Sequence, residues 1–289
     1  MNFDDLIEKK LVLARPHGRL PITLYKYHRK VFYKGLFTQD KRLRWARGIV
    51  LDDDGKIVTR PFYKYYNYGE NHAGEDWNDN DMVLAVEKIN GFMISVSRYN
   101  GELIFSSTGT FDSDYVELGK RYIMYNQNDT LSFIKEGMTC VFEICATEDP
   151  HIINEKIGPY LIGVWRRSEF DPYDPAGMFY TPYMNQGYIQ HVAKQEGFRF
   201  AQHKVTTWGD VRTDLLTDTH EGWMVYNRDN PNIEEQVIKL KSPYYLVTKL
   251  LARHALHKDH RPKFDKLRQI IDEEYYDLLN ELEANQEEF

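Results

Sequence analysis

A lysine stands where an alternating run of apolar residues ends, in the stretch MVLAVEKING that begins at Met82. Met82, Leu84 and Val86 recur at every second position, which is typical of a strand with one buried face. Lys88 follows this predicted strand, where it is either a surface charge or a nucleophile. The spacing Lys-x-x-Gly, completed by Gly91, decides nothing alone, because about one match is expected in a chain of this length.

Further charged residues lie on or beside predicted strands. In chain order they are Arg47, Lys64, Glu143, Glu221, Lys239 and Lys241. A charge buried in a sheet costs free energy unless it is paired or has a function. Lys239 and Lys241 stand two residues apart on a predicted strand, so their side chains project to one face. They are either part of a site or an exposed edge pair that opposes aggregation. Glu143 is either a site residue or the partner of a structural arginine.

Turn signals and periodicity predict the elements that position these residues. Hairpins are predicted around Asp54-Gly55 and around Asn100-Gly101. Further strands are predicted in MTCVFEIC, YLIGVWRR, EGWMVYN and QVIKLK, and helices from Ser113, Tyr183 and Thr207. Strands that alternate with irregularly placed helices, without a regular βα repeat, indicate an α+β fold.

The character of the sequence changes after Lys241. Ser242-Pro243 is a helix start, with serine as the N-cap and proline at the first helical position. A second amphipathic helix is predicted from Arg261. We therefore expect one large domain at residues 1–241 and a small all-helical appendage at residues 242–289.

Composition predicts an ordinary folded chain, with 28% charged and 14% aromatic residues and a net charge of -7. The charge is polarised, because residues 9–47 contain 12 Lys and Arg against one acid, whereas residues 271–289 contain eight acids and no base. The basic stretch is either a phosphate-binding surface or a solvated face. The acidic tail is expected to be a solvated helix face.

Cysteine and histidine spacing argues against a structural zinc site and a redox-active cysteine pair. Cys140 and Cys145, in TCVFEICA, match neither a zinc knuckle nor a CxxC pair, and are predicted to be inert core residues in a reducing setting. Apart from a weak pair, the histidines lack zinc-ligand spacing on a common face, so a structural metal site is not expected. No run approaches the ~20 apolar residues that span a bilayer, and no secretory leader is recognisable, so a membrane partner is not expected.

Taken in order, the charged motifs resemble the covalent nucleotidyltransferase superfamily. ARGIV with Arg47 and RPFYKYYNYGE with Lys64 precede the lysine motif, while VFEI with Glu143, HEGWMVYN with Glu221 and IKLK follow it. With these upstream stretches the chain is similar to the bacteriophage-type ATP-dependent RNA ligases of the RNA ligase 1 family, over about residues 40–241. The resemblance implies an ATP-grasp-like ligase adenylylation domain, a nucleotidyltransferase fold of antiparallel sheets with flanking helices.

The resemblance implies a reaction in three transfers. The Lys88 amine attacks the α-phosphate of ATP, which forms a lysyl-adenylate and releases pyrophosphate. AMP then moves to a 5′-phosphate end of RNA, and a 3′-hydroxyl finally displaces AMP and joins the ends. In such in-line transfers, catalysis consists of positioning and charge stabilisation. The attacking amine must be neutral, and nearby cations or a metal ion favour the loss of its proton.

The resemblance also implies a role for each motif residue. Lys239 and Lys241 would act with Lys88 and hold α-phosphate oxygens, and Glu221 would bind Mg²⁺, with Mn²⁺ as an alternative. The implied nucleotide ligands are Glu87 at the adenine amino group, Gly91 at a close backbone turn, Arg47 and Lys64 at the β and γ phosphates, Glu143 at the ribose or the metal ion, and Trp165 or Val164 stacked on adenine.

Some positions depart from the family's pattern. Asn90 stands where the lysine motif often has aspartate, so no role is predicted for a charge there. Thr108 and Tyr245 occupy positions at which some relatives have lysine. We therefore expect this chain to bind the triphosphate more loosely than those relatives, or with a different set of residues.

Other functions stay open at this stage. DNA ligases and capping-type nucleotidyltransferases share the lysine motif, but the 48 residues after Lys241 have a helical pattern and leave no room for the OB-fold of those enzymes. A non-catalytic nucleic-acid-binding module would use the basic stretch and the tyrosines, yet would not explain the ordered set. The expected partners are RNA ends with 5′-phosphate and 3′-hydroxyl groups, not restricted to tRNA, with DNA ends as an alternative. We expect a monomer in the cytoplasm, which is the host cytoplasm if a phage encodes it.

Overall fold

The structure is a computed structural model that describes residues 1–125, 131–167, 186–227, 237–255, 268 and 280. The chain divides into two compact units. Unit 1 comprises Met1–Tyr65, Gly91–Ala146 and Lys156–Gln202, and unit 2 comprises Tyr66–Asn90, Thr147–Glu155 and His203–Phe289. The division predicted at residues 241 and 242 stays a prediction, because most of the chain beyond residue 255 lies outside the described residues.

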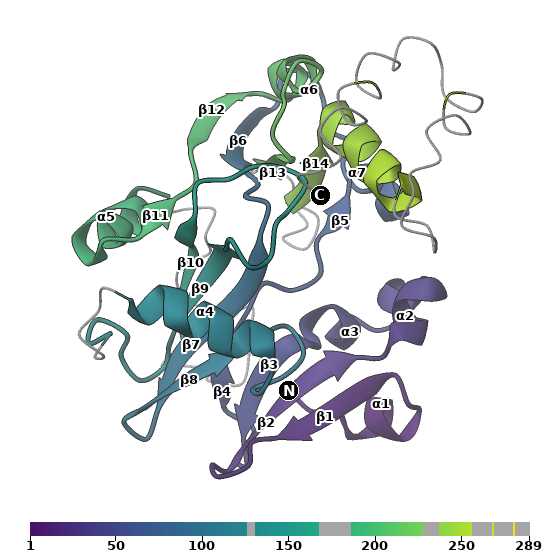
Figure 1. Cartoon of the computed structure of the whole chain (residues 1–289). Helices are drawn as coiled ribbons and strands as arrows, with labels where there is room; N and C mark the ends of the chain where they lie inside the picture. The colour runs from purple at the N-terminus through teal and green to yellow at the C-terminus, as the bar shows by residue number, and fades with distance from the viewer. Residues whose placement is uncertain (126–130, 168–185, 228–236, 256–267, 269–279, 281–289) are drawn as a thin grey trace. The chain divides into compact units, whose positions relative to one another are not determined.

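The first sheet of unit 1 is antiparallel, with the strand order β1-β2-β3-β4. Its strands are β1 (Val12–Pro16), β2 (Ile22–Tyr27), β3 (Arg47–Asp52) and β4 (Ile57–Thr59). The predicted hairpin of β3 and β4 is confirmed, and Gly55 supplies a φ of 79° at its turn. Short helical segments accompany this sheet, namely α1 (Asp4–Glu8), α2 (Arg29–Tyr33), η1 (Leu36–Thr38) and α3 (Arg42–Trp45) (Figure 1).

The second sheet of unit 1 has the order β11-β10-β9-β7-β8 and is antiparallel except between β10 and β11. Its strands are β7 (Phe92–Tyr99), β8 (Glu102–Ser106), β9 (Met138–Cys145), β10 (Gly158–Arg166) and β11 (Arg199–Phe200). The predicted hairpin of β7 and β8 is confirmed. Asn100 and Gly101 both have positive φ, at 51° and 80°, which is the requirement of a type I′ turn.

Two helices of unit 1, α4 (Asp114–Met124) and α5 (Gln186–Glu196), pack on the second sheet, and α4 crosses its face in Figure 1. The core beneath them contains Ile94, Cys140 and Phe142, all fully buried. Cys140 and Cys145 are unbridged and buried, as predicted, and burial raises the pKa of the Cys140 thiol. Because strand residues alternate, Glu143 emerges from the opposite face of this sheet.

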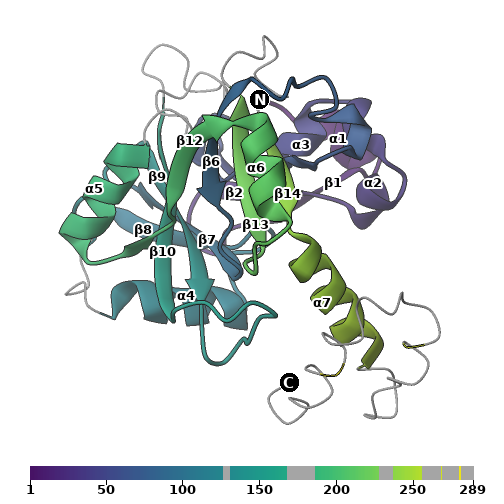
Figure 2. The same cartoon turned by 90° about the horizontal axis from the view of Figure 1, so that it is seen from above.

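The sheet of unit 2 has the order β12-β6-β13-β14-β5 and is antiparallel except between β14 and β5. Its strands are β5 (Tyr66–Asn67), β6 (Met82–Glu87), β12 (His203–Thr207), β13 (Gly222–Asn227) and β14 (Val237–Lys241). A 3-10 turn, η2 (Glu70–His72), follows β5. Helix α6 (Trp208–Leu215) lies against this sheet (Figure 2), where buried Trp208 packs edge-on against Trp77.

The predicted helix starts are confirmed where the structure describes them. Ser113 and Thr207 accept hydrogen bonds from the backbone N–H three residues on, at 3.3 and 3.2 Å. Ser242 does the same for Tyr245 at 3.1 Å, and α7 (Pro243–Ala255) begins after it. The second predicted C-terminal helix and nearly all of the acidic tail lie outside the described residues.

The fold is therefore α+β and rich in antiparallel sheet, as predicted. In the described part of the chain, no helix has the length and hydropathy needed to cross a bilayer.

Candidate active site

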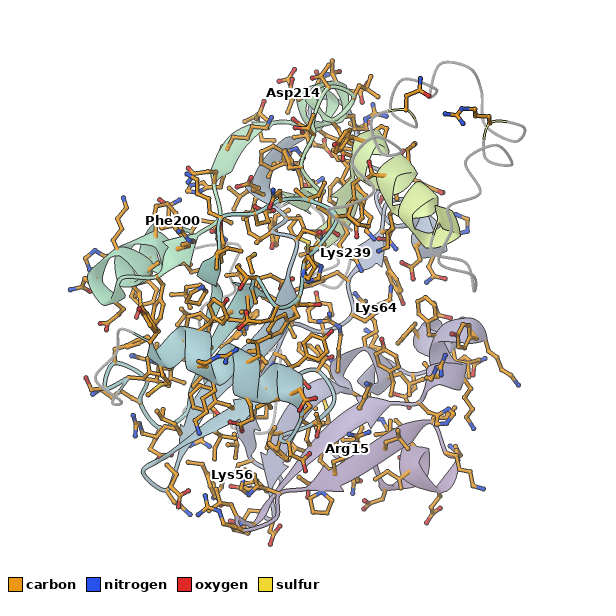
Figure 3. All side chains as sticks on the ribbon, in the orientation of Figure 1. Arg15, Lys56, Lys64, Phe200, Asp214 and Lys239 are labelled. Atoms are coloured by element: carbon orange, nitrogen blue, oxygen red, sulfur yellow. The ribbon has the colours of Figure 1, made fainter. Side chains whose placement is uncertain are left out.

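Lys88 is joined by its backbone to the sheet of unit 2. Its N–H donates to the carbonyl of Gly222 at 2.9 Å, and Gly222 is the register partner of Lys241. These three residues therefore form one row across the ends of β6, β13 and β14. Lys239 lies two rows away, in the row that also contains Val86. Alternation thus brings Lys239 and Lys241 to one sheet face, which Lys88 shares if it continues the alternation of β6. Lys239 is labelled on β14 in Figure 3.

The Lys88 ammonium forms an ion pair with Glu221. The distance between Lys88 Nζ and Glu221 Oε2 is 2.8 Å, and the side chains are 22% and 3% exposed. Glu221 is placed by the glycine after it, because Gly222 has a φ of 135° and an added Cβ would lie 2.1 Å from the Leu240 carbonyl oxygen. The Glu221 carbonyl accepts from Ser242 N–H at 3.0 Å, which ties it to the start of α7. The sequence analysis named Lys88 and Glu221 as members of two separate motifs, and folding brings their side chains into contact.

Asn90 bridges Glu221 to a segment that the sequence did not single out. Its Nδ2 donates to Glu221 Oε2 at 2.7 Å, and its Oδ1 accepts from the Ile153 N–H at 3.2 Å. The Asn90 N–H donates to Glu155 Oε1 at 3.2 Å. An aspartate at this position could not donate to Glu221 while ionised. Asn90 therefore matters as a hydrogen-bond donor, a role that the sequence analysis missed by considering only its charge.

Glu155 completes what we call the Lys88 cluster, which consists of Lys88, Asn90, Glu155 and Glu221. Burial raises the pKa of the Glu155 carboxyl, and the charges of Glu87 and Glu221 act in the same direction, against the hydrogen bond from Asn90 and the charge of His220. No motif or spacing pointed to Glu155, because the segment that carries it has no regular periodicity. Sequence reasoning had no signal with which to find it.

The turn before β13 is held by side-chain hydrogen bonds. His220 Nδ1 accepts from the Gly222 N–H at 3.0 Å, and His220 Nε2 lies 3.1 Å from Asp218 Oδ2. Trp223 Nε1 donates to the same Asp218 oxygen at 2.7 Å, while Ser242 Oγ donates to the His220 carbonyl at 2.6 Å. These bonds support the turn that presents Glu221. Among the described residues, no group of three or more His, Cys, Asp and Glu side chains gathers around a metal position.

Glu87 is the last residue of β6 and is paired with Trp223. Because strand residues alternate, Glu87 faces the side of the sheet opposite to Val86. Its implied contact with the adenine amino group stays a prediction.

Several predicted nucleotide ligands belong to unit 1. Glu143 Oε1 accepts from the Gly91 N–H at 3.3 Å, and a Cβ at Gly91 would lie 2.4 Å from the carbonyl oxygen of the residue after Glu143. Only glycine fits this approach. Arg47 Nη1 donates to the Phe62 carbonyl at 3.1 Å and lies 3.9 Å from Met93 Sδ. Met93 is the register partner of Glu143, so Arg47 and Glu143 gather around one side chain.

Lys64, labelled in Figure 3, is buried and donates to the Tyr65 carbonyl at 3.2 Å. Trp165 is also fully buried, and the Arg60 guanidinium lies 3.4 Å over its ring. Val164 belongs to the helix-covered core. An adenine could stack on Trp165 only if Arg60 moved away from the ring. The implied role of Trp165 in stacking on adenine therefore stays a prediction.

Comparison with known proteins identifies the family of this chain. The sequence model of the family described as RNA ligase matches residues 45–249, which is more than half of the chain. The chain belongs to this RNA ligase family. The match includes every motif residue that the sequence analysis named, from Arg47 to Lys241.

This RNA ligase family member can be compared with one distant curated relative. It is 23% identical over 215 residues to the "Putative RNA ligase" of Thermovibrio ammonificans, which covers 70% of this chain and 52% of that protein. The chain thus spans about half the length of this curated relative.

Solved structures show the same fold. The "Putative ATP-dependent DNA ligase from Aquifex aeolicus" has a TM-score of 0.56 at 13% identity and covers 95% of this chain and 68% of that one. The "Archaeal ATP-dependent RNA ligase - form 1" has a TM-score of 0.53 at 12% identity and covers 92% and 68%. At these identities the likeness concerns the fold alone.

Proposed function

We propose that the chain is an ATP-dependent RNA ligase that works through a covalent lysyl-AMP on Lys88. Family membership supports ligation, and the ATP-dependent ligases with the same fold support the use of ATP. The observation that carries the assignment of Lys88 is its ammonium 2.8 Å from a nearly fully buried carboxylate. A solvated surface lysine needs no such partner, because exposed ion pairs contribute little to stability.

The first transfer follows from the cluster. Lys88 Nζ, after losing its proton, forms a bond to the α-phosphorus of ATP while the bond from that phosphorus to the pyrophosphate oxygen breaks. Glu221 Oε2 and the Asn90 amide hold the side chains in place before the attack. Lys241, which lies in the same row of the sheet as Lys88, and Lys239, two rows away, attract the negative phosphate oxygens. AMP then passes to the 5′-phosphate of RNA, and a 3′-hydroxyl displaces it.

The residues of unit 2 fit a magnesium ion. Both described donors to Glu221, from Lys88 and Asn90, contact Oε2, which leaves Oε1 to bind a metal. Mg²⁺ needs only one or two protein carboxylates, since waters and phosphates supply its other ligands. When bound there, Mg²⁺ or Mn²⁺ would stabilise charge on the phosphates. The metal and nucleotide roles implied for the unit 1 residues remain predictions, namely those of Arg47, Lys64, Gly91, Glu143 and Trp165.

The test uses ATP labelled at the α-phosphate. Wild-type protein is mixed with labelled ATP and Mg²⁺, denatured and examined for label on the protein, beside Lys88→Ala and a control Lys56→Ala. Lys56 is a partly exposed lysine, 3.5 Å from the Asp54 carboxylate. We expect label on wild type and Lys56→Ala but not on Lys88→Ala. An unlabelled wild type that mass spectrometry shows to carry no AMP would contradict the proposal and favour a non-catalytic binding module.

The acceptor is tested in a second step. Labelled protein is isolated and given a 5′-phosphorylated single-stranded RNA, a DNA of the same sequence, or a nicked tRNA anticodon loop. We propose that RNA ends are joined without restriction to tRNA. A strong preference for the tRNA or for DNA would overturn this part while leaving the lysyl-AMP intact.

A further inference from the structure

Helix α2 of unit 1 exposes two adjacent aromatic rings. Val31 is fully buried and anchors the helix, while Phe32 is 55% and Tyr33 70% exposed. The two rings meet edge to face, with centroids 5.6 Å apart. Aromatic side chains usually bury most of their area, so two neighbouring exposed rings indicate a contact surface.

Cations surround these rings. Arg29 and Lys34 are exposed, and Lys30 Nζ donates to the Lys9 carbonyl at 2.9 Å. This bond brings the end of α1, with exposed Lys9 and Lys10, beside α2, and both views show the two helices as neighbours (Figures 1 and 2). Residues 9–39 contain eight Lys and Arg and no acid. We name the α2 patch from its members, which are Lys9, Lys10, Arg29, Lys30, Phe32, Tyr33 and Lys34.

Two acids near the patch in sequence, Asp5 and Asp40, are paired with Arg42, which is not a member of the patch. Asp5 on α1 is held by Arg42 at 2.7 Å, and Lys9 is 3.5 Å from the same carboxylate. Arg29 Nη2 donates to the Tyr33 hydroxyl at 3.1 Å, and its guanidinium lies 5.7 Å from the centre of the Tyr33 ring. This hydrogen bond keeps the ring and a cation together on the surface. The rings and the positive charges thus form one surface.

We propose that the α2 patch binds a single-stranded stretch of the RNA substrate, with bases stacked on Phe32 and Tyr33 and phosphates held by the flanking cations. Unstacked bases have free faces for aromatic side chains, whereas bases in a duplex do not. The cations match the phosphate backbone in charge, which favours RNA over an apolar protein partner. The inference rests on the proposed function and adds to it the surface that holds the strand outside the reacting ends.

The experiment measures the anisotropy of a fluorescein-labelled single-stranded RNA without a 5′-phosphate, and of the same RNA as a duplex. The variant carries Phe32→Ala and Tyr33→Ala together. The matched control is Tyr125→Ala, because Tyr125 is another tyrosine of unit 1 and is 83% exposed. We expect the double variant to weaken single-strand binding by about tenfold or more, and the control to bind as wild type. Duplex binding is expected to change little.

Conservative and charge variants keep the test decisive if the double variant fails to fold. Phe32→Tyr with Tyr33→Phe retains both rings and should bind like wild type. Lys34→Gln should lower the slope of log affinity against log salt by about 0.7, the amount expected for one phosphate contact on a single strand. Three outcomes would overturn the proposal. The folded double variant could bind single-stranded RNA with wild-type affinity, or Lys34→Gln could leave the salt slope unchanged. Tyr125→Ala could also lose as much affinity as the double variant. Wild-type RNA binding by the double variant would leave the rings as a contact for a protein partner.

Self-labelling with ATP separates this inference from the proposed function, because that step needs no RNA. Label on wild type and double variant alike, with weaker RNA binding only in the variant, supports both. If both proteins are labelled and the double variant binds RNA like wild type, only the proposal for the α2 patch is overturned. If wild type carries no AMP and is not labelled, but RNA binding still depends on Phe32 and Tyr33, the ligase mechanism is overturned. The proposal for the α2 patch would then still hold.

Discussion

The Lys88 cluster and the α2 patch use charge in opposite ways. In the cluster, Glu221 is almost completely buried and takes hydrogen bonds from both Lys88 and Asn90 on one oxygen. In the patch, Arg29 and Lys34 are exposed among few acids. Buried charges interact strongly over short distances, whereas exposed charges are screened and act collectively. The first arrangement suits chemistry at one atom, and the second suits the retention of a long anionic strand.

The largest expected effect comes from removing the Lys88 amine. Lys88→Arg keeps a cation beside Glu221 but cannot form the lysyl-adenylate, so we expect no detectable label with near wild-type thermal stability. Lys88→Met leaves the buried carboxylate without its cation, which we expect to cost about 3 kcal/mol. Labelling and chemical denaturation of both variants separate the two roles. A labelled Lys88→Arg protein would show that the nucleophile lies elsewhere.

Glu221→Gln tests the buried carboxylate with little change in shape. In the proposed mechanism Glu221 orients Lys88 and binds a metal ion, so loss of its charge should lower the rate of self-labelling by about 10²–10³-fold. The rate measured across a range of Mg²⁺ concentrations should also require more metal to saturate. Glu102→Gln is the control, since Glu102 pairs with Arg19 on the surface at 3.0 Å. Equal rates in wild type and Glu221→Gln would reduce the cluster to a structural ion pair.

Asn90→Asp changes the bridging amide into a carboxylate of the same shape. An ionised carboxylate would face the Glu221 oxygen that now lies 2.7 Å from Asn90 Nδ2, so both stability and labelling should fall. We expect about 1–3 kcal/mol of destabilisation and a ~10-fold or greater loss of labelling rate. Asn90→Ala removes the donor without adding a charge and should retain more activity. Greater activity in Asn90→Asp than in Asn90→Ala would contradict the role of Asn90 as a donor.

The smallest effect is expected at Asp5, which lies near the α2 patch. The hydrogen bond with Arg42 lowers the pKa of Asp5 to about 2, from a usual value of 3.8. A lowered folded-state pKa contributes stability above pH 3.8 that is lost as the pH falls toward 2. Asp5→Asn should therefore have a slightly lower Tm than wild type at pH 5, and this difference should disappear near pH 2. A difference that persists at pH 2 would assign the effect to packing.

Much of the candidate site could be named from the sequence, but its contacts could not. Lys88, Glu221, Lys239 and Lys241 stand in recognisable strand contexts, and the register of β13 and β14 brings Lys239 and Lys241 to one face, as the alternation predicted. The bridge through Asn90 was missed, because it depends on the position of residues 147–155 rather than on any nearby pattern. The stacking of Arg60 on Trp165 was equally invisible, since neither residue is close to the other in the chain.

The sequence by itself determined the local structure of this protein. Asn100-Gly101 sets a hairpin, and Ser113, Thr207 and Ser242 begin helices, because φ/ψ preferences and cap hydrogen bonds involve only neighbouring residues. Only the tertiary structure decided that one Glu221 oxygen serves both Lys88 and Asn90. That contact requires β6 to pair with β13, and such long-range pairing depends on the packing of the whole sheet rather than on any local stretch.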